Sequence, residues 1–411
     1  MCLSPNILPA FEQLGLYEEL LSFSKPALRS TFYTGDLEVI AESETLTTES
    51  VGYDRILFAR TKLYELLFKK IPAEKVHKSK KIVSFEQSQD GVTLTFDDST
   101  TARGDILVGA DGAHSAVRQQ LYKALDNDGI LPKADTKEMG KGYISLVGTT
   151  DALDTTKYPG LLKEDSECHY MIGDKSNPYT WITFTVPENR VCWNVIIQLG
   201  LDPIADEQIK NLDWTPQQHQ KKLLDSLRHF RTPNGTLGDL FDATPLDQVC
   251  KVSFEDVLFD TWNHGRTVLI GDGMLLPTSG AGAVNAMQDA VLLANHIYDI
   301  KRVNFENIKT ALKEYKEERF DSVKDQYSHS HMSAKLILGH TFWERVLRQI
   351  IFNWVPQSLL TAQLVKDTAY RPQANFLPQA PKRGTIDVLP QKPSKRVQEQ
   401  EEAQNKAVSA I

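Results

Sequence analysis

The sequence predicts an α/β fold in which a β-rich domain interrupts a domain built on a parallel sheet. Two short apolar runs, at 105–109 and 267–271, have the composition of strands that are buried on both faces. Between about residues 143 and 260, strand-like runs alternate with polar, proline-containing loops, which is typical of a mixed or antiparallel sheet. We therefore expect four parts: residues 1–142, the β-rich domain 143–260, residues 261–370 with the C-terminal helices, and a tail 371–411.

The first part combines short helices and short strands. Apolar spacing predicts helices at 5–23 and 60–71 and strands at 31–41 and 51–58. Pro72 ends the second of these helices, because proline lacks the N–H that a helix interior needs. A hairpin follows, with two alternating strands that meet at Asp90 and Gly91.

The segments after the β-rich domain are mainly helical. A long helix is compatible with 283–300, and more helix is expected from residue 305 onward. Apolar residues within 342–354 form one helical stripe, which could lie on a membrane surface, although packing against the body of the protein is the simpler interpretation. The tail is rich in Pro, Gln, Lys and Glu, and beyond Pro390 we expect it to be disordered.

The composition excludes some classes of function. Hydrophobic residues make up 41% of the 411 residues, enough for a sizeable core, whereas the formal net charge of −8 argues against general nucleic-acid binding. The four cysteines lie far apart and none is in a C-x-x-C pair, so we expect free thiols and no metal site. The sequence has neither a secretory leader nor an apolar run of roughly 18 residues, which predicts a soluble, cytoplasmic protein.

The first segment with chemical content is 104–122. Its strand ends at Gly109, a turn follows through Asp111 and Gly112, and a helix is expected to begin near Ser115. Glycine lets a backbone approach a ligand closely, and a carboxylate at the end of a strand can reach a hydroxyl or position a phosphate. From the residues alone, a purely structural turn with a helix cap is an equal alternative.

The second segment is 265–297, where another buried strand ends at Gly271 and Asp272. Gly280 and Gly282 then precede a helix, so the first backbone N–H groups of that helix could face a ligand and stabilise negative charge, as on a reduced flavin ring. The carboxylate of Asp272 can accept a hydrogen bond from a sugar-like hydroxyl. A glycine-rich tight turn between packed elements is the alternative.

Both segments resemble signatures of the class A FAD-dependent monooxygenases, the p-hydroxybenzoate hydroxylase-like family. Segment 109–118 is similar to the family's Asp-Gly signature and 271–289 to its Gly-Asp signature, in the family's order, and 370–378 resembles C-terminal segments of fungal members. The resemblance implies an FAD/NAD(P)-binding domain of the glutathione-reductase type, N-terminally incomplete, with an inserted mixed β-sheet substrate domain. The residues that it assigns to cofactor binding are Arg60, Asp111, Gly112, Gly271, Asp272, Gly280, Gly282, Ala283 and Asn285.

The resemblance also implies roles and a reaction. Arg60 would contact FAD, Asp111 and Gly112 would lie near the pyrophosphate and the NAD(P)H, and Asp272 would hold the ribityl hydroxyls, while the residues from Gly280 to Asn285 would shape the isoalloxazine site. In the family, NAD(P)H reduces the flavin, and O2 then serves to hydroxylate or epoxidise a small organic substrate. The sequence identifies no catalytic side chain, no particular substrate and no oligomeric state.

The sequence departs from the family pattern in two places. Members begin with a strand, a G-x-G-x-x-G turn and a helix that bind the ADP half of FAD, and no such unit is present, so we interpret the sequence as truncated and expect weakened flavin binding. In the Gly-Asp signature, Pro277 comes about two residues early and the usual histidine is missing, so we expect the turn beside the flavin to be displaced. A non-catalytic binding protein derived from the family is therefore the alternative function.

Overall fold

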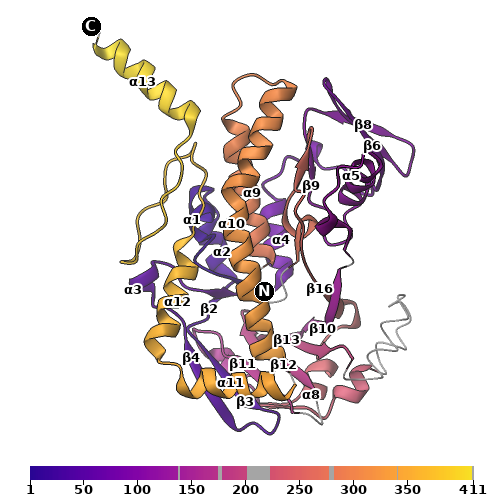
Figure 1. The fold of residues 1–411 in the computed structure, drawn as a ribbon. Helices are drawn as coiled ribbons and strands as arrows, with labels where there is room; N and C mark the ends of the chain where they lie inside the picture. The colour runs from indigo at the N-terminus through magenta and orange to yellow at the C-terminus, as the bar shows by residue number, and fades with distance from the viewer. Residues whose placement is uncertain (138, 175–177, 201–222, 277–281, 340, 410–411) are drawn as a thin grey trace.

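The computed structural model describes residues 1–137, 139–174, 178–200, 223–276, 282–339 and 341–409. It has the expected α/β fold, with a large mixed sheet, a small mixed sheet and a long helix, α10, that runs along the molecule (Figure 1). The four cysteines are free, as expected.

The elements are described here in chain order, with η for a 3-10 helix. Those of the first part are β1 (Cys2–Leu3), α1 (Leu8–Gln13), α2 (Tyr17–Ser22), β2 (Lys25–Pro26), β3 (Arg29–Thr34), β4 (Val39–Glu44), α3 (Thr48–Val51), β5 (Ile56–Leu57), α4 (Arg60–Phe68), η1 (Ala73–Lys75), β6 (Ile82–Ser88), β7 (Gly91–Phe96), β8 (Thr101–Gly104), β9 (Leu107–Gly109), α5 (Ala116–Asn127) and η2 (Lys133–Thr136). Those of the β-rich part are β10 (Gly140–Thr149), η3 (Pro159–Leu162), β11 (Cys168–Ile172), β12 (Tyr179–Val186), β13 (Arg190–Gln198), β14 (Arg231–Thr232), β15 (Gly235–Thr236), α8 (Leu237–Asp242), η4 (Leu246–Gln248) and β16 (Cys250–Leu258). The remaining elements are β17 (Asn263–His264), β18 (Thr267–Leu269), η5 (Gly271–Gly273), β19 (Leu275–Leu276), α9 (Gly282–Tyr298), α10 (Phe305–Leu338), α11 (Phe342–Trp354), α12 (Gln357–Ala369) and α13 (Lys395–Ser409).

The largest sheet has eight strands in the order β19-β16-β10-β13-β12-β11-β3-β4. All neighbours are antiparallel except β11 and β3, which run parallel, so the expected mixed sheet is confirmed. Its membership extends beyond residues 143–260, because β3 and β4 come from the first part and β19 from the third. Local patterning carries no information on which distant strand each of these segments pairs with.

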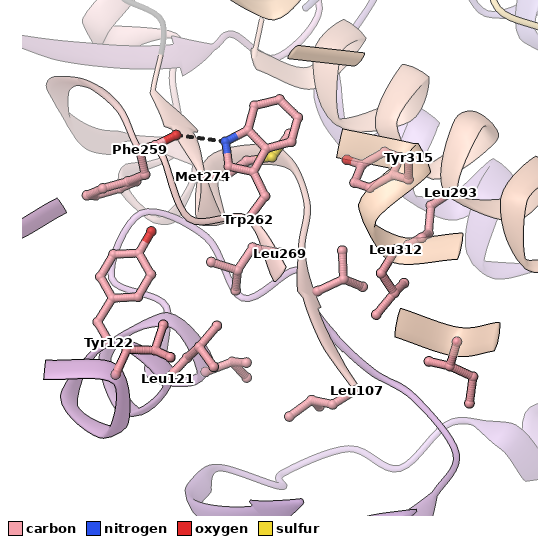
Figure 2. Packing of buried hydrophobic residues seen from close by; sticks show 14 of the residues in the cluster. Leu107, Leu121, Tyr122, Phe259, Trp262, Leu269, Met274, Leu293, Leu312 and Tyr315 are labelled. Atoms are coloured by element: carbon pink, nitrogen blue, oxygen red, sulfur yellow. Dashed lines mark hydrogen bonds between the residues drawn. The ribbon is translucent and has the colours of Figure 1, made fainter. Parts of the chain in front are cut away.

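Three short strands, in the order β17-β18-β9, form a second sheet, in which β18 and β9 are parallel. The cluster of buried side chains around it joins this sheet to α5, α9 and α10, as Figure 2 shows. Its centre is Trp262, which is fully buried and donates its indole N–H to the carbonyl of Phe259 at 2.7 Å (Figure 2). The indole therefore contributes its apolar area without leaving a buried donor unpaired.

The first predicted helix is two helices. Gly15 separates α1 from α2 with a φ of +65°, a left-handed conformation that glycine adopts without steric cost. The predicted helix at 60–71 and the hairpin around Gly91 are confirmed as α4 and as β6 with β7.

The C-terminal tail departs from the expected disorder, because Lys395–Ser409 form helix α13. Backbone and side-chain hydrogen bonds hold the residues before it: Arg371 donates to the carbonyl of Val51 at 2.7 Å, and the amide of Ala374 donates to Gln13 at 2.9 Å. The low apolar content of the tail concealed this, because polar contacts fix much of its path.

Candidate active site

The two segments with chemical content leave the small sheet at the same edge. Strands β9 and β18 are parallel, with Gly109 beside Leu269, and the amide of Ile270 donates to the carbonyl of Gly109 at 3.0 Å. The loops that follow these strands therefore begin next to each other. In open α/β sheets, ligands bind outside the carboxyl ends of the strands, which makes this edge the candidate site.

Gly109 is needed for this arrangement. A Cβ atom at this position would lie 2.8 Å from Leu269 Cδ2 and 3.0 Å from Val117 Cβ. The absent side chain thus lets β18 and α5 approach β9 closely.

The carboxylate of Asp111 caps helix α5. Its Oδ2 accepts the backbone N–H groups of Ala116 at 2.7 Å and Val117 at 3.2 Å, and its Oδ1 accepts the hydroxyl of Ser115. These bonds satisfy N–H groups that have no partner inside the helix. Gly112 follows with a φ of +83° and open space where a side chain would project. The cap explains Asp111 structurally, whereas Gly112 leaves room for a ligand.

The Gly-Asp loop, η5, lies close to α9. Gly271 has a φ of +58°, and a Cβ atom there would lie 2.9 Å from the Cβ of Ala286. Asp272 keeps an exposed surface, yet the surrounding protein raises the pKa of its carboxyl; the charge of Arg60 opposes this rise and that of Asp289 adds to it. The carboxyl is thus exposed to solvent and at the same time partly desolvated by the surrounding protein.

Arg60 lies near Asp272. It is the first residue of α4, it is exposed, and its side chain makes no hydrogen bond with any residue in the described ranges. Its charge acts on Asp272, so the structure brings together two residues that are 212 positions apart in the sequence, from 60 to 272. Its guanidinium remains available to a ligand with acceptor oxygens.

Helix α9 begins beside this loop with Gly282 and Ala283, both half-buried. Gly280 lies outside the described residues. Asn285 takes a different position from the other predicted residues, because it is buried and its Oδ1 accepts a hydrogen bond from Arg319 at 2.7 Å. Its side-chain oxygen is therefore bonded to Arg319 inside the protein.

Arg319, on α10, is the centre of a buried polar cluster that the sequence did not indicate. Its side chain is fully buried, and its Nε donates to Asp289 Oδ1 at 2.7 Å, while Nη2 donates to Asn285 and to Gln288 at 3.0 Å. The other oxygen of Asp289 accepts the amide of Gly271 at 2.9 Å. Asp289 thus connects α9, α10 and the first residue of the Gly-Asp loop.

A sequence signal for this cluster existed on α9. Asn285, Gln288 and Asp289 are spaced i, i+3 and i+4 within an apolar helix, so they share one face. Burial raises the pKa of Asp289, and the ion pair with Arg319 opposes that rise. Two tyrosine hydroxyls nearby, those of Tyr315 and Tyr370, are buried and have no hydrogen-bond partner among the described residues.

The residues after the Gly-Asp pair form a strand rather than an open turn. Met274 is fully buried, its carbonyl accepts the amide of Phe259 at 3.1 Å, and β19 pairs with β16. Pro277 lies outside the described residues, which end at 276 and resume at 282. The expected displacement of the turn beside the flavin therefore stays a prediction.

A family model described as "FAD binding domain" matches residues 2–329. The chain belongs to this FAD-binding family. Its cofactor is therefore FAD, and the resemblance that the sequence motifs indicated is confirmed.

The relatives are fungal FAD-dependent monooxygenases. The enzyme nvfK of Aspergillus novofumigatus is 26% identical over 395 residues, which are 92% of this chain and 80% of that protein. The enzyme paxM of Penicillium paxilli is 26% identical over 401 residues, which are 92% of this chain and 78% of that protein. These relatives place the chain among the FAD-dependent monooxygenases.

Solved structures share its fold. Klebsiella pneumoniae HpxO, in a complex with FAD and uric acid, matches with a TM-score of 0.70 at 20% identity, over 90% of this chain and 88% of that chain. The 2,6-dihydroxypyridine-3-hydroxylase from Arthrobacter nicotinovorans matches with a TM-score of 0.64 at 19% identity, over 83% of each chain. The expected fold class is thus confirmed.

Proposed function

We propose that this protein is a monooxygenase that uses FAD, NAD(P)H and O2 to hydroxylate or epoxidise a small organic substrate. The observation that carries the proposal is the meeting of three elements at the carboxyl ends of the parallel strands β9 and β18. These are the loop after β9, the Gly-Asp loop after β18, and the first residue of α4, whose charge acts on Asp272.

The described residues fit the flavin-containing half of FAD. Gly112 leaves open space beside the first loop, and the guanidinium of Arg60 has no protein partner in the described ranges. We assign Arg60 to acceptor oxygens of FAD, Gly112 to the approach of the pyrophosphate or of NAD(P)H, and Gly271 with Asp272 to the ribityl hydroxyls. Gly280, Gly282 and Ala283 would then face the isoalloxazine ring from the start of α9.

Asp111 and Asn285 receive indirect roles in this proposal. Asp111 fixes the start of α5 and thereby the turn at Gly112. Asn285 joins the cluster of Arg319, which holds the amide of Gly271 through Asp289. Both side chains would position the loops that contact the cofactor.

When bound, FAD supplies the transfer of electrons from the nicotinamide to O2 and the delivery of one oxygen atom to the substrate. The protein side chains hold the cofactor, orient the substrate and exclude water. We assign substrate binding to the part of the protein that contains the eight-stranded sheet, and we take residues 143–260 as the substrate domain. The relative HpxO, crystallised with uric acid, supports a small-molecule substrate.

Flavin binding and reduction test the proposal. Full-length protein is mixed with FAD, free flavin is removed, and the visible spectrum is recorded before and after addition of NADH or NADPH without oxygen. We expect about one flavin per chain and its bleaching by a nicotinamide. We also expect Arg60→Ala and Asp272→Ala to weaken FAD binding at least tenfold, because each removes a hydrogen-bonding group worth roughly 1.5–3 kcal/mol when charged.

The matched control is Lys70→Ala, which removes an exposed cation just beyond the other end of α4. It should bind FAD like the wild type. A folded protein that binds no flavin at millimolar FAD would refute the monooxygenase proposal. Thermal stabilisation by a small molecule in that flavin-free protein would then identify a non-catalytic binding protein.

A further inference from the structure

Helix α11 presents its apolar side to solvent. At about 100° per residue, positions 343, 350 and 354 lie within roughly 40° of one line along the helix. The exposed fractions of Trp343, Ile350 and Trp354 are 76%, 48% and 80%. Phe342, at 62%, lies at the edge of this stripe. The expectation that the stripe packs against the body was therefore wrong for these four residues, whereas Val346, Leu347 and Ile351 of the same stripe are half-buried.

The opposite, inner side of α11 holds the helix in place. Arg348 is buried and donates through Nε to the carbonyl of Leu336 at 2.7 Å and through Nη2 to the carbonyl of Gly339. These carbonyls belong to the C-terminal end of α10, where the last turn lacks partners within its own helix. Phe352 adds a ring contact with Phe32 of β3, with 5.1 Å between centroids.

The start of α11 is also fixed. The side chain of Thr341 accepts the amide of Glu344, and the carboxylate of Glu344 accepts the amide of Thr341 at 3.0 Å, a complete capping box. The outward direction of the apolar stripe is therefore fixed by bonds at the start and at the middle of the polar side, and α11 lies across the end of α10 (Figure 1).

The charged residues of α11 keep clear of the stripe. Glu344, Arg345 and Arg348 all lie at least about 100° from Trp343 around the helix, whereas the outward arc carries only apolar residues and Asn353. A surface without charge, with a tryptophan at each end, matches the boundary between headgroups and acyl chains, where indole rings concentrate. A protein partner would more often place complementary charges at the rim.

The size of the stripe also favours a lipid surface over a second copy of the chain. A helix of 13 residues is about 20 Å long, so the outward half of its surface is on the order of 400 Å². A stable dimer buries about 800 Å² on each partner. A fluid bilayer needs no matching shape and surrounds the whole outward half of a helix.

We propose that the outward face of α11 binds the surface of a zwitterionic phospholipid bilayer, with the helix parallel to the membrane plane. Trp343 and Trp354 enter the headgroup region, Ile350 lies between them, and Leu359 of α12, exposed at 62%, extends the contact. The formal net charge of −8 gives no attraction to anionic lipid, so the contact depends on apolar burial. This mode lies on the membrane without crossing it, and within the described ranges no helix has the length and apolar character needed to cross a bilayer.

Flotation with phosphatidylcholine vesicles tests the proposal, using full-length protein. We expect the wild type to float with the vesicles, and the variant Trp343→Ser/Trp354→Ser to bind at least tenfold more weakly at equal circular dichroism. The matched control is Tyr64→Ser/Leu162→Ser, which removes two side chains that are 64% and 70% exposed elsewhere. This control should bind vesicles like the wild type.

Quenching by brominated phosphatidylcholine gives a second measurement. Trp181, Trp193 and Trp262 are buried in the body, so quenching that is lost in Trp343→Phe/Trp354→Phe locates the contact at the stripe. Failure of the wild type to bind vesicles overturns the proposal. So does equal binding by the double serine variant, or a wild-type dimer that becomes monomeric in that variant and never binds lipid.

Discussion

Replacement of Arg319 by methionine gives a quantitative test of the cluster below the Gly-Asp loop. Arg319 and Asp289 have no exposed side-chain surface, and their ion pair has an N–O distance of 2.7 Å. Arg319→Met keeps the unbranched stem of the side chain to about the position of Nε but leaves a buried carboxylate without its cation. Removal of one partner from a buried ion pair costs about 3–5 kcal/mol.

This cost corresponds to a measurable change in melting temperature. The entropy of unfolding is about 2.1 cal/mol/K per residue, or about 0.9 kcal/mol/K for 411 residues that unfold together. A loss of 3–5 kcal/mol then lowers the melting temperature by about 3–6 °C. The control Lys324→Met removes an exposed cation from the same helix and should change it by less than about 1 °C.

The pH dependence has a defined sign. Burial raises the pKa of Asp289, and Arg319 opposes that rise, so the variant has a still higher pKa at Asp289. A carboxyl with a folded pKa above its unfolded value binds more protons when folded, so its contribution to stability is lost as the pH rises through the folded pKa. The deficit of Arg319→Met relative to wild type is therefore larger near pH 8 than near pH 5.

Differential scanning calorimetry at these two pH values provides the assay, with Arg319→Met/Asp289→Asn as the third variant. The double variant no longer buries an unpaired charge, and the asparagine can still accept the amide of Gly271, so it should regain part of the lost stability. The reasoning is refuted if Arg319→Met has the same melting temperature as the Lys324→Met control. It is also refuted if Asp289→Asn lowers the melting temperature of Arg319→Met further at both pH values.

Three further predictions follow from single residues. Tyr315→Phe removes a buried hydroxyl that has no hydrogen-bond partner in the part of the chain that the structure describes, so unfolding should require about 1 kcal/mol more in urea titrations, and a loss of stability would contradict this. Gly271→Ala places a side chain at a φ of +58°, which costs about 1–2 kcal/mol, and should lower both stability and FAD affinity; an unchanged affinity in a spectral titration would separate the loop from the cofactor. Hydrogen bonds from Lys157 and then Thr236 lower the pKa of Asp239 to about 2, so its contribution to stability is present above its unfolded pKa and fades as the pH falls towards 2. Asp239→Asn should therefore destabilise the protein at neutral pH, with a difference from wild type that shrinks between about pH 5 and pH 3; a constant difference would argue against the ionised group.

The sequence predicted those parts of the fold and site that depend on local order. A short apolar strand followed by glycine and a carboxylate is a pattern of neighbouring residues, so the strands β9 and β18 were predicted from local residue order, while the ligand roles of Gly112 and Asp272 remain predictions. The role of Asp111 stayed open because the same carboxylate can cap a helix or meet a ligand, and only its bonds to Ala116 and Val117 identify the cap. Arg319 escaped notice because its partners lie on another helix.

The direction of α11 shows most clearly what a periodic pattern omits. Periodicity establishes that Trp343, Ile350 and Trp354 share a stripe, but a helix can be rotated about its axis without any change in that pattern. Hydrophobic burial alone would turn the stripe inward. The hydrogen bonds of Arg348 to the end of α10 oppose that rotation, because inward tryptophans would displace the guanidinium and leave the carbonyls of α10 without donors. The rule that an apolar stripe faces the core thus fails where tertiary hydrogen bonds fix the rotation of the helix. Such exceptions concentrate at surfaces that bind a partner.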